Sequence, residues 1–276
     1  MYGKISITSG NLHLNTAFMT GIVILPLVPL RESDSERSEM TSQLLFGELV
    51  EILETRERWL LLRNLSDNYI GWADRKMIQV LSDAKALQLT SSNPSCVCIP
   101  LLEGKDLSSG DKLTLPGGSR LVGLNGIELK IDNNNFLFDP ILLHQGTEKS
   151  GERLISLARQ YLNAPYLWGG KSLLGIDCSG FVQVVFSMCG IQLPRDASQQ
   201  VNCGQLISFL SEAKAGDLAL FENQDGKITH VGILLNSHQI IHASGWVKIE
   251  SIDSQGIISA QTGEYTHKLR VIKRIL

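Results

Sequence analysis

Residues 175–189 read GIDCSGFVQVVFSMC and carry the strongest structural signal in the chain. The run from Cys178 to Cys189 is apolar around most of its girth, which predicts a helix buried in a core. Gly190 follows it and suits the left-handed position that ends many helices. Cys178 is therefore expected at the start of a buried helix, where the helix dipole favours an anion and lowers the pKa of a thiol.

A second helix and several strands flank this segment in the sequence. Leu154, Ala158 and Leu162 fall on one helical face, with Ser150 near the start and Pro165 ending the pattern. Later strands are expected at 217–221, 228–235, 239–243 and 269–275. A helical front followed by antiparallel strands predicts an α+β domain over residues 147–276.

The first half of the chain reads as short strands separated by turns. Strands are expected at 22–29, 48–54, 59–63 and 69–73, and turns about every 8–12 residues are typical of a small barrel. Further on, Asn125-Gly126 between 120–124 and 127–131 predicts a type I′ hairpin. The sequence thus predicts two small barrels, at 1–81 and 82–146.

Composition excludes several classes of protein. The 276 residues suit one to three domains, and 43% hydrophobic with 19% charged residues rules out wholesale disorder. A net charge of −3 gives no general attraction to nucleic acid or to anionic membranes. No apolar run approaches the roughly 18–20 residues that a membrane-spanning helix needs. We therefore expect no nucleic-acid and no membrane partner.

Cysteine usage and the N-terminal segment bear on the compartment. The five cysteines are an odd number without a CxxC pair, which favours free thiols in a reducing compartment, and those other than Cys178 are interpreted as inert. Residues 17–30 have the length of a signal-peptide core, but Pro26 and Pro29 interrupt it and no small-x-small site follows. The expected location is cytoplasmic, and export is the alternative if the start site is misassigned.

A nucleophilic thiol needs a base, and the base needs an orienting group. His230 and His242 lie on consecutive predicted strands. A three-residue loop at 235–237 would place them directly opposite, with Cβ atoms about 4.5–5.5 Å apart. A two-residue loop at 236–237 would turn them to opposite faces, so catalysis requires an odd loop or a bulge. A zinc site made of Cys178 and this pair is an alternative that matches no metal spacing. The remaining histidines are interpreted as surface or turn residues: His13, His144, His238 and His267.

Six segments in order give the second half a specific resemblance. They are APYLWGG (164–170), GIDCSGF (175–181), LPRDASQQ (193–200), AGDLALF (215–221), THVGI (229–233) and IHASG (241–245). Together they resemble the NlpC/P60 family of cell-wall cysteine peptidases over 148–276. Residues 47–73, GELVEILETRERWLLLRNLSDNYIGWA, resemble a bacterial SH3-like (SH3b) domain. The whole chain is similar to γ-D-glutamyl-L-diamino-acid endopeptidases of the YkfC type.

The resemblance implies a papain-like fold and a catalytic triad. Cys178 would be the nucleophile, His230 the base and His242 the orienting residue, with no metal or organic cofactor. Tyr166 matches the tyrosine of the family's PYxxGG segment and would stabilise the oxyanion or form the edge of the site. Trp168 would line the pocket. The plain alternative for both aromatic residues is packing.

The resemblance also implies substrate contacts. Asp177 and Ser179 match the Asp-Cys-Ser motif that holds the substrate ammonium in relatives requiring a free N-terminal L-Ala. The alternative is that Asp177 only caps the helix. Asp196 and Ser198 match the PRD-x-x-Q segment near the γ-D-Glu pocket. Arg195 beside them would pair with a carboxylate, and the alternative is that it pairs simply with the protein.

The first SH3-like domain would close one end of the cleft. Glu39 and Tyr69 are the best matches to the acidic residue and the tyrosine that reach the substrate in YkfC-like relatives. The alternatives are a solvated loop carboxylate for Glu39 and barrel packing for Tyr69.

The resemblance implies a monomeric peptidase of murein peptides. It would cut between γ-linked D-Glu and the following diamino acid, meso-diaminopimelate or Lys, in peptides with a free N-terminal L-Ala, during recycling of cell-wall peptides. Two alternatives stay open: a secreted hydrolase of intact peptidoglycan anchored by its SH3-like domains, and an inactive wall-binding adaptor. The presence of all three triad residues argues against the adaptor.

Overall fold

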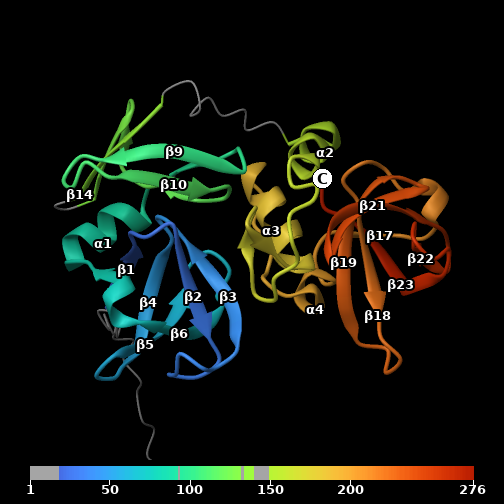
Figure 1. Ribbon diagram of the computed structural model, residues 1–276, viewed down its shortest axis with the longest axis horizontal. Coiled ribbons are helices and arrows are strands. Elements are labelled where there is room, and N and C mark those ends of the chain that lie inside the picture. The colour runs from blue at the N-terminus through green and yellow to red at the C-terminus, as the bar shows by residue number, and fades with distance from the viewer. Residues whose placement is uncertain (1–18, 93, 132–133, 140–148) are drawn as a thin grey trace, which may run out of the picture.

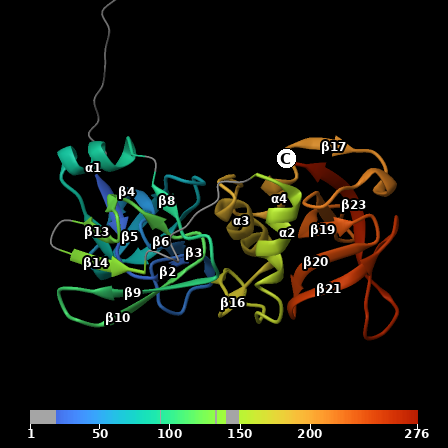
Figure 2. The ribbon, with the colours of Figure 1, turned by 90° about the horizontal axis from the view of Figure 1, so that it is seen from above.

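A computed structural model describes residues 19–92, 94–131, 134–139 and 149–276 (Figure 1). Two β-rich regions in the first half of the chain lie on one side of a central helix, and a barrel-like sheet lies on its other side (Figures 1 and 2). No helix within the described ranges is long and apolar enough to cross a bilayer. His13 and His144 lie outside the described residues.

The first sheet contains seven strands in the order β3-β2-β6-β5-β4-β1-β7. Its elements are β1 (Thr20–Val23), β2 (Leu27–Arg31), β3 (Met40–Leu45), β4 (Leu49–Thr55), β5 (Trp59–Asn64), β6 (Ile70–Asp74), η1 (Arg75–Met77) and β7 (Ile78–Val80). The prediction of one strand over 22–29 is wrong. The chain bends between β1 and β2 at Pro26, whose ring removes the N–H that a continuous ladder needs.

The second region has an apolar cluster of its own, distinct from that of the first, and residues of the first region join it. Its elements are α1 (Asp83–Thr90), β8 (Ser95–Cys96), β9 (Leu101–Asp106), β10 (Lys112–Pro116), β11 (Arg120–Leu121), β12 (Leu124–Asn125), β13 (Glu128–Ile131) and β14 (Asn134–Phe138). Phe46 of the first region meets Phe136 edge to face, at 5.2 Å between ring centroids. Ile22 joins the same apolar cluster. The two regions therefore share buried surface.

The predicted hairpin of the second region is displaced by one residue. Asn125 pairs with Glu128, so Gly126 and Ile127 form the turn in place of Asn125-Gly126. Gly126 has a φ of +63°, which a glycine adopts without strain. The predicted strand 120–124 is also divided into β11 and β12.

The third region has the α+β arrangement expected from the sequence. Helices α2 (Gly151–Arg159) and α3 (Cys178–Met188) begin after Ser150 and Asp177, whose side chains accept the N–H groups of Arg153 and Gly180. The other elements are β15 (Lys171–Ser172), β16 (Gly175–Ile176), α4 (Ala197–Gln200), β17 (Gln205–Ile207), η3 (Leu210–Glu212), β18 (Leu218–Glu222), β19 (Ile228–Asn236), β20 (Gln239–Ser244), β21 (Trp246–Ile252), β22 (Gly256–Ile258) and β23 (Tyr265–Arg274). Five of these strands are absent from the predicted set: β15, β16, β17, β21 and β22.

The last sheet closes on itself and leaves α3 as the centre of the molecule. Its order is β17-β23-β18-β19-β20-β21-β22, and β22 pairs back onto β23. Every residue of α3 is buried. One side of the helix shares a core with Val231 and Ile233 of β19, and the same core reaches Leu45 of β3. The start of α3 is thereby fixed between the barrel and the first sheet.

Candidate active site

Cys178 is the first residue of α3 and is 6% exposed. The backbone N–H groups of Val231 and Ser179 donate toward its sulfur, which places the thiol against β19. Burial, together with the neighbouring Asp177 charge, still raises the pKa of the Cys178 thiol to about 11. The resting thiol is therefore neutral near pH 7, and its attack requires a base.

His230 and His242 meet on one face of the barrel sheet. His230 Nε2 lies 2.9 Å from His242 Nδ1, and both side chains are buried. A bulge between Leu234 and Asn236 shifts the register of β19 against β20 by one residue. Asn236 pairs with Gln239 beside the turn, and beyond the bulge Leu234 pairs with Ile240.

The bulge near Asn236 was required by the sequence argument, and its presence confirms that the two histidines share a face. The expected three-residue loop and direct opposition are wrong. The turn is Ser237-His238, and continuing the register places His230 diagonally across from His242, within reach of an imidazole.

Gly232 explains how the orienting histidine fits. Continuing the same register puts Gly232 opposite His242. A Cβ atom at Gly232 would lie 2.8 Å from the Cβ of His242 and 2.7 Å from Cδ1 of Ile240. The glycine of the THVGI segment therefore provides the space that His242 occupies.

Glu250 of β21 completes a chain of buried polar groups and was missed by the sequence analysis. Its Oε2 lies 2.9 Å from His242 Nε2, while its Oε1 accepts the N–H of Ala260 at 3.1 Å. Although burial opposes ionisation, the hydrogen bonds from His242 and Ala260 lower the pKa of Glu250 to about 2. Glu250 could have been identified from the alternation of buried and exposed side chains along β21, together with the pairing of β21 against β20.

The ionised Glu250 determines where the protons of the two imidazoles lie. A carboxylate can only accept, so His242 carries its proton on Nε2 and leaves Nδ1 as an acceptor. His230 then donates from Nε2 to that acceptor, and its Nδ1 is left with the free lone pair of a base. Burial, followed by the positive neighbours, lowers the pKa of His230 well below its ordinary value, so the resting ring is neutral.

Cys178 contacts the strand that carries His230 and makes no direct hydrogen bond with the imidazole among the described residues. Val231 follows His230 in β19 and donates its N–H toward the sulfur, so the strand that carries the base also contacts the nucleophile.

The interpretation of His267 as a surface or turn residue is wrong, since it packs against this pair. His238 does lie exposed in the β19–β20 turn, as expected.

Asp177 has a buried cationic partner that the sequence analysis did not assign to it. Arg195 is 1% exposed, and its guanidinium donates hydrogen bonds to both carboxylate oxygens of Asp177, with 3.0 Å between Nη1 and Oδ1. Arg195 also donates to Ser179 and Ser42. Asp177 accepts the N–H groups of Gly169 and Gly180 as well, which confirms its capping role. The carboxylate of Asp177 is therefore already paired before any substrate ammonium binds.

The edge of the site is built from two regions of the chain. Trp168 is 60% exposed, and its indole nitrogen donates to Glu39 Oε1 of the first region at 2.5 Å. Tyr69 donates to the carbonyl of Thr41 at 3.5 Å. Burial raises the pKa of Tyr69, and Asp196 and Arg195 of the PRD segment are among the charges that act on it.

The remaining residues that were predicted to line the site differ in how deeply they are buried. Burial and the Cys178 charge raise the pKa of Tyr166 to about 12, which keeps its hydroxyl protonated beside the thiol. Asp196 caps α4, and burial raises its pKa. Ser198 is an exposed residue of α4, and its side chain makes no hydrogen bond to the described residues.

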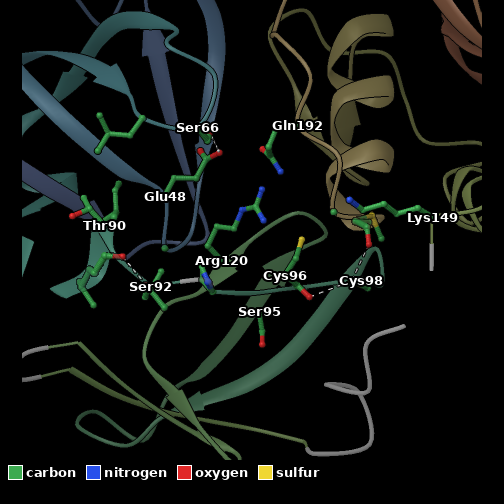
Figure 3. A pocket seen from close by; sticks show the side chains of 18 residues that line it. Glu48, Ser66, Thr90, Ser92, Ser95, Cys96, Cys98, Arg120, Lys149 and Gln192 are labelled. Carbon is green, nitrogen blue, oxygen red and sulfur yellow. Dashed lines mark hydrogen bonds between the residues drawn. The ribbon is translucent and has the colours of Figure 1, made fainter. Parts of the chain in front are cut away.

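A separate cavity of about 760 Å³ lies at the opposite end of α3 (Figure 3). Glu48 and Ser66 come to it from the first region, Arg120 from the second, and Met188 and Gln192 from the far end of the helix. Within the described chain, its lining includes none of the groups around the thiol. The cavity is therefore distinct from the candidate active site.

Comparison with known proteins finds a family match in each half of the chain. The model of the NlpC/P60 family matches residues 163–266, and that of the bacterial dipeptidyl-peptidase Sh3 domain matches residues 30–78. A probable endopeptidase NlpC homolog of Haemophilus influenzae is 35% identical over 131 residues, which are 46% of this chain and 69% of the relative. The chain belongs to the NlpC/P60 family. Cys178, His230 and His242 all lie within the residues that the family model matches.

Other members of the NlpC/P60 family align over different lengths. A gamma-D-glutamyl-L-lysine dipeptidyl-peptidase of Bacillus subtilis is 39% identical over 106 residues, 38% of this chain, and the alignment spans 34% of that relative. Dipeptidyl-peptidase 6 of Lysinibacillus sphaericus is 26% identical over 261 residues, 86% of this chain and 93% of its own. The crystal structure of an NlpC/P60 family protein from Bacillus cereus matches with a TM-score of 0.74 and 18% identity, covering 93% and 99% of the two chains, and supports the shared fold.

Proposed function

We propose that this protein is an endopeptidase of murein peptides. It cuts the bond between γ-linked D-Glu and the following diamino acid, meso-diaminopimelate or Lys, in peptides that begin with a free L-Ala. The observation that carries the proposal is the contact of Glu39 with Trp168, because a carboxylate of the SH3-like region then stands at the edge of the peptidase site. The names of the Bacillus and Lysinibacillus relatives support the same reaction class.

In this mechanism His230 Nδ1 takes the proton of the Cys178 thiol as the sulfur attacks the γ-carbonyl of D-Glu. The tetrahedral oxyanion is stabilised by N–H groups at the start of α3 and by the protonated hydroxyl of Tyr166. His242 and the ionised Glu250 stabilise the imidazolium that forms on His230.

Collapse of that intermediate separates the two products. The imidazolium passes its proton to the amine of the diamino acid, which leaves, and the acyl group remains as a thioester on Cys178. His230 Nδ1 then takes a proton from water, which hydrolyses the thioester and releases L-Ala-γ-D-Glu.

Charge at the edge of the site supports selection of a free amine. Glu39, Asp177 and Asp196 contribute three formal negative charges and Arg195 one positive charge, which leaves a sum of −2. Since Arg195 already neutralises Asp177, the carboxylates of Glu39 and Asp196 are the proposed receptors of the substrate ammonium. Tyr69 and Ser198 supply further hydroxyl groups there.

The experiment is a digest of defined peptides analysed by mass. L-Ala-γ-D-Glu-Lys and L-Ala-γ-D-Glu-meso-diaminopimelate should be cut at the γ-linked bond, and their N-acetyl forms much more slowly. Cys178→Ala should abolish cleavage, while the matched variant Cys203→Ala should keep it. Equal rates on free and acetylated peptides, or on intact peptidoglycan, would favour the wall-hydrolase alternative.

The preference for a free amine also suggests where the enzyme works. Peptides with a free L-Ala are those already released from glycan, so we place the reaction in peptide recycling. We further propose that the enzyme acts as a monomer in the cytoplasm. Fractionation of cells and size-exclusion chromatography with light scattering test these two statements directly.

A further inference from the structure

A third histidine lies against the His230–His242 pair. His267 belongs to β23, where it pairs with Ile257 of β22. Its ring stacks on His230 with 4.1 Å between centroids and 29° between planes. The same ring stands edge-on to His242 at 5.7 Å. The NlpC/P60 triad predicted from the sequence did not include this residue.

The two rings are held from the other sides as well. Phe221 of β18 lies 5.6 Å from the ring centroid of His230 and 5.9 Å from that of His267. The Nδ1 atom of His267 lies 2.9 Å from Thr266 Oγ1, so the stacking ring has a fixed orientation of its own. The ring of His267 is thus held in place by its own neighbours, and the ring of His230 packs flat against it.

We propose that His267 is a positioning residue that fixes the ring plane of the base. The inference rests on His230 acting as the base of the proposed function. The single hydrogen bond from His230 Nε2 to His242 fixes one atom of the ring but permits rotation about that bond. A flat stack removes this rotation, and therefore fixes the direction in which the lone pair on Nδ1 points.

The charge state of His267 suits this role. Burial, followed by repulsion from the protonated form of His242, lowers the pKa of His267 to about 4. The groups that face it are His230 from β19, His242 from β20, and Lys248 and Glu250 from β21, and Glu250 alone among them raises the pKa. A neutral ring at working pH offers its π face to the imidazolium that forms on His230 during attack.

The experiment compares His267→Ala, His267→Phe and, as a matched control, His238→Ala in the exposed turn. Removing the stack should lower kcat by about tenfold with KM changed less than about twofold, because a misplaced base costs rate and leaves binding intact. Phe restores a flat ring and should recover most of kcat. The acid limb of the pH profile of kcat should move to higher pH in His267→Ala, because the exposed His230 regains water. It should move less in His267→Phe, because the phenyl ring keeps His230 buried.

A second readout separates this inference from the proposed substrate. The rate at which iodoacetamide alkylates Cys178, followed by mass mapping, reports the base without any peptide. It should fall in His267→Ala and recover in His267→Phe, even if the chosen peptides are not cut. An unchanged alkylation rate and kcat in a folded His267→Ala protein would overturn the inference. A rise in KM alone would make His267 a substrate contact, and a loss in His267→Phe equal to that in His267→Ala would also overturn the stacking role.

Discussion

The carboxylate of Glu250 lies 2.9 Å from Nε2 of His242, so a buried anion ends the chain that begins at His230. Its second oxygen is held by the N–H of Ala260, which keeps the carboxylate in place. The chain Glu250–His242–His230 therefore sets both the tautomer of the base and the stability of its charged form.

Glu250→Gln should leave the shape of the site intact but remove the negative charge. We expect kcat to fall by roughly 10²–10³-fold, because an analogous carboxylate-to-amide change in a hydrolase triad costs about 10⁴-fold. Steady-state kinetics on the tripeptide provide the measurement, with Glu264→Gln on the exposed surface as the control. A kcat within about twofold of wild type would remove Glu250 from the mechanism.

Gly232→Ala tests the space that His242 occupies. The new methyl group would lie 2.8 Å from the Cβ of His242, and either the strand or the imidazole must move. Overpacking of this kind costs about 1–3 kcal/mol of folding free energy, and the displaced His242 should lower kcat further. Denaturant unfolding and kinetics measured together check both effects. Full activity in Gly232→Ala would mean that His242 tolerates the displacement.

Arg195→Met tests the ion pair with Asp177. The change leaves a buried carboxylate without its cation, and loss of one partner from a buried pair costs about 3–5 kcal/mol. The double variant with Asp177→Asn should recover part of that loss. Arg56→Met is the matched control, because Arg56 pairs with Asp34 and Glu54 at the surface and such pairs contribute about 0–1 kcal/mol. Equal losses at both arginines would contradict a special role for the buried pair.

The pH dependence of stability has a predictable sign at His267. Its pKa is about 4 in the folded protein against a usual value of about 6.5. Between these values the unfolded chain binds the proton and the folded chain does not, so the free energy of unfolding falls as the pH drops from about 6.5 to about 4. His267→Phe should flatten this dependence, and His238→Gln should not. Denaturant unfolding at several pH values measures it, and parallel curves for His267→Phe and wild type would rule out the lowered pKa.

Local patterns predicted the elements that carry the nucleophile and the base. The apolar character of 178–189 around the whole helix predicted α3. The alternation of side chains along a strand required an odd loop or a bulge if His230 and His242 were to lie on one face, and the bulge is present. Contacts between distant segments were not accessible in the same way. Glu250 was missed because β21 was not predicted, and the partner of Asp177 depended on the path of the loop that carries Arg195.

The organisation of the first half shows the same limit. Two small barrels were expected, and the contact between them could not be specified: Phe46 of the first region packs against Phe136 in the apolar cluster of the second. Alternation within one strand reports which face is buried and not which neighbour buries it. Side-chain contacts across regions, such as that of Glu39 with Trp168, therefore needed the folded structure.

Glu39→Gln isolates the charge that the proposed function assigns to amine recognition. The amide oxygen can still accept the indole N–H of Trp168, so the contact between the two regions survives and only the negative charge is lost. We expect kcat/KM for the free-amine tripeptide to fall by about tenfold, which corresponds to about 1.4 kcal/mol, while the rate on the N-acetyl peptide stays unchanged. Glu36→Gln in the same loop is the matched control, because Glu36 pairs with Arg58. The effect of Glu39→Gln should shrink as salt is added, since the carboxylate is exposed and its field is screened. Equal losses on the free and acetylated peptides would show that Glu39 supports the position of Trp168 and does not read the substrate ammonium.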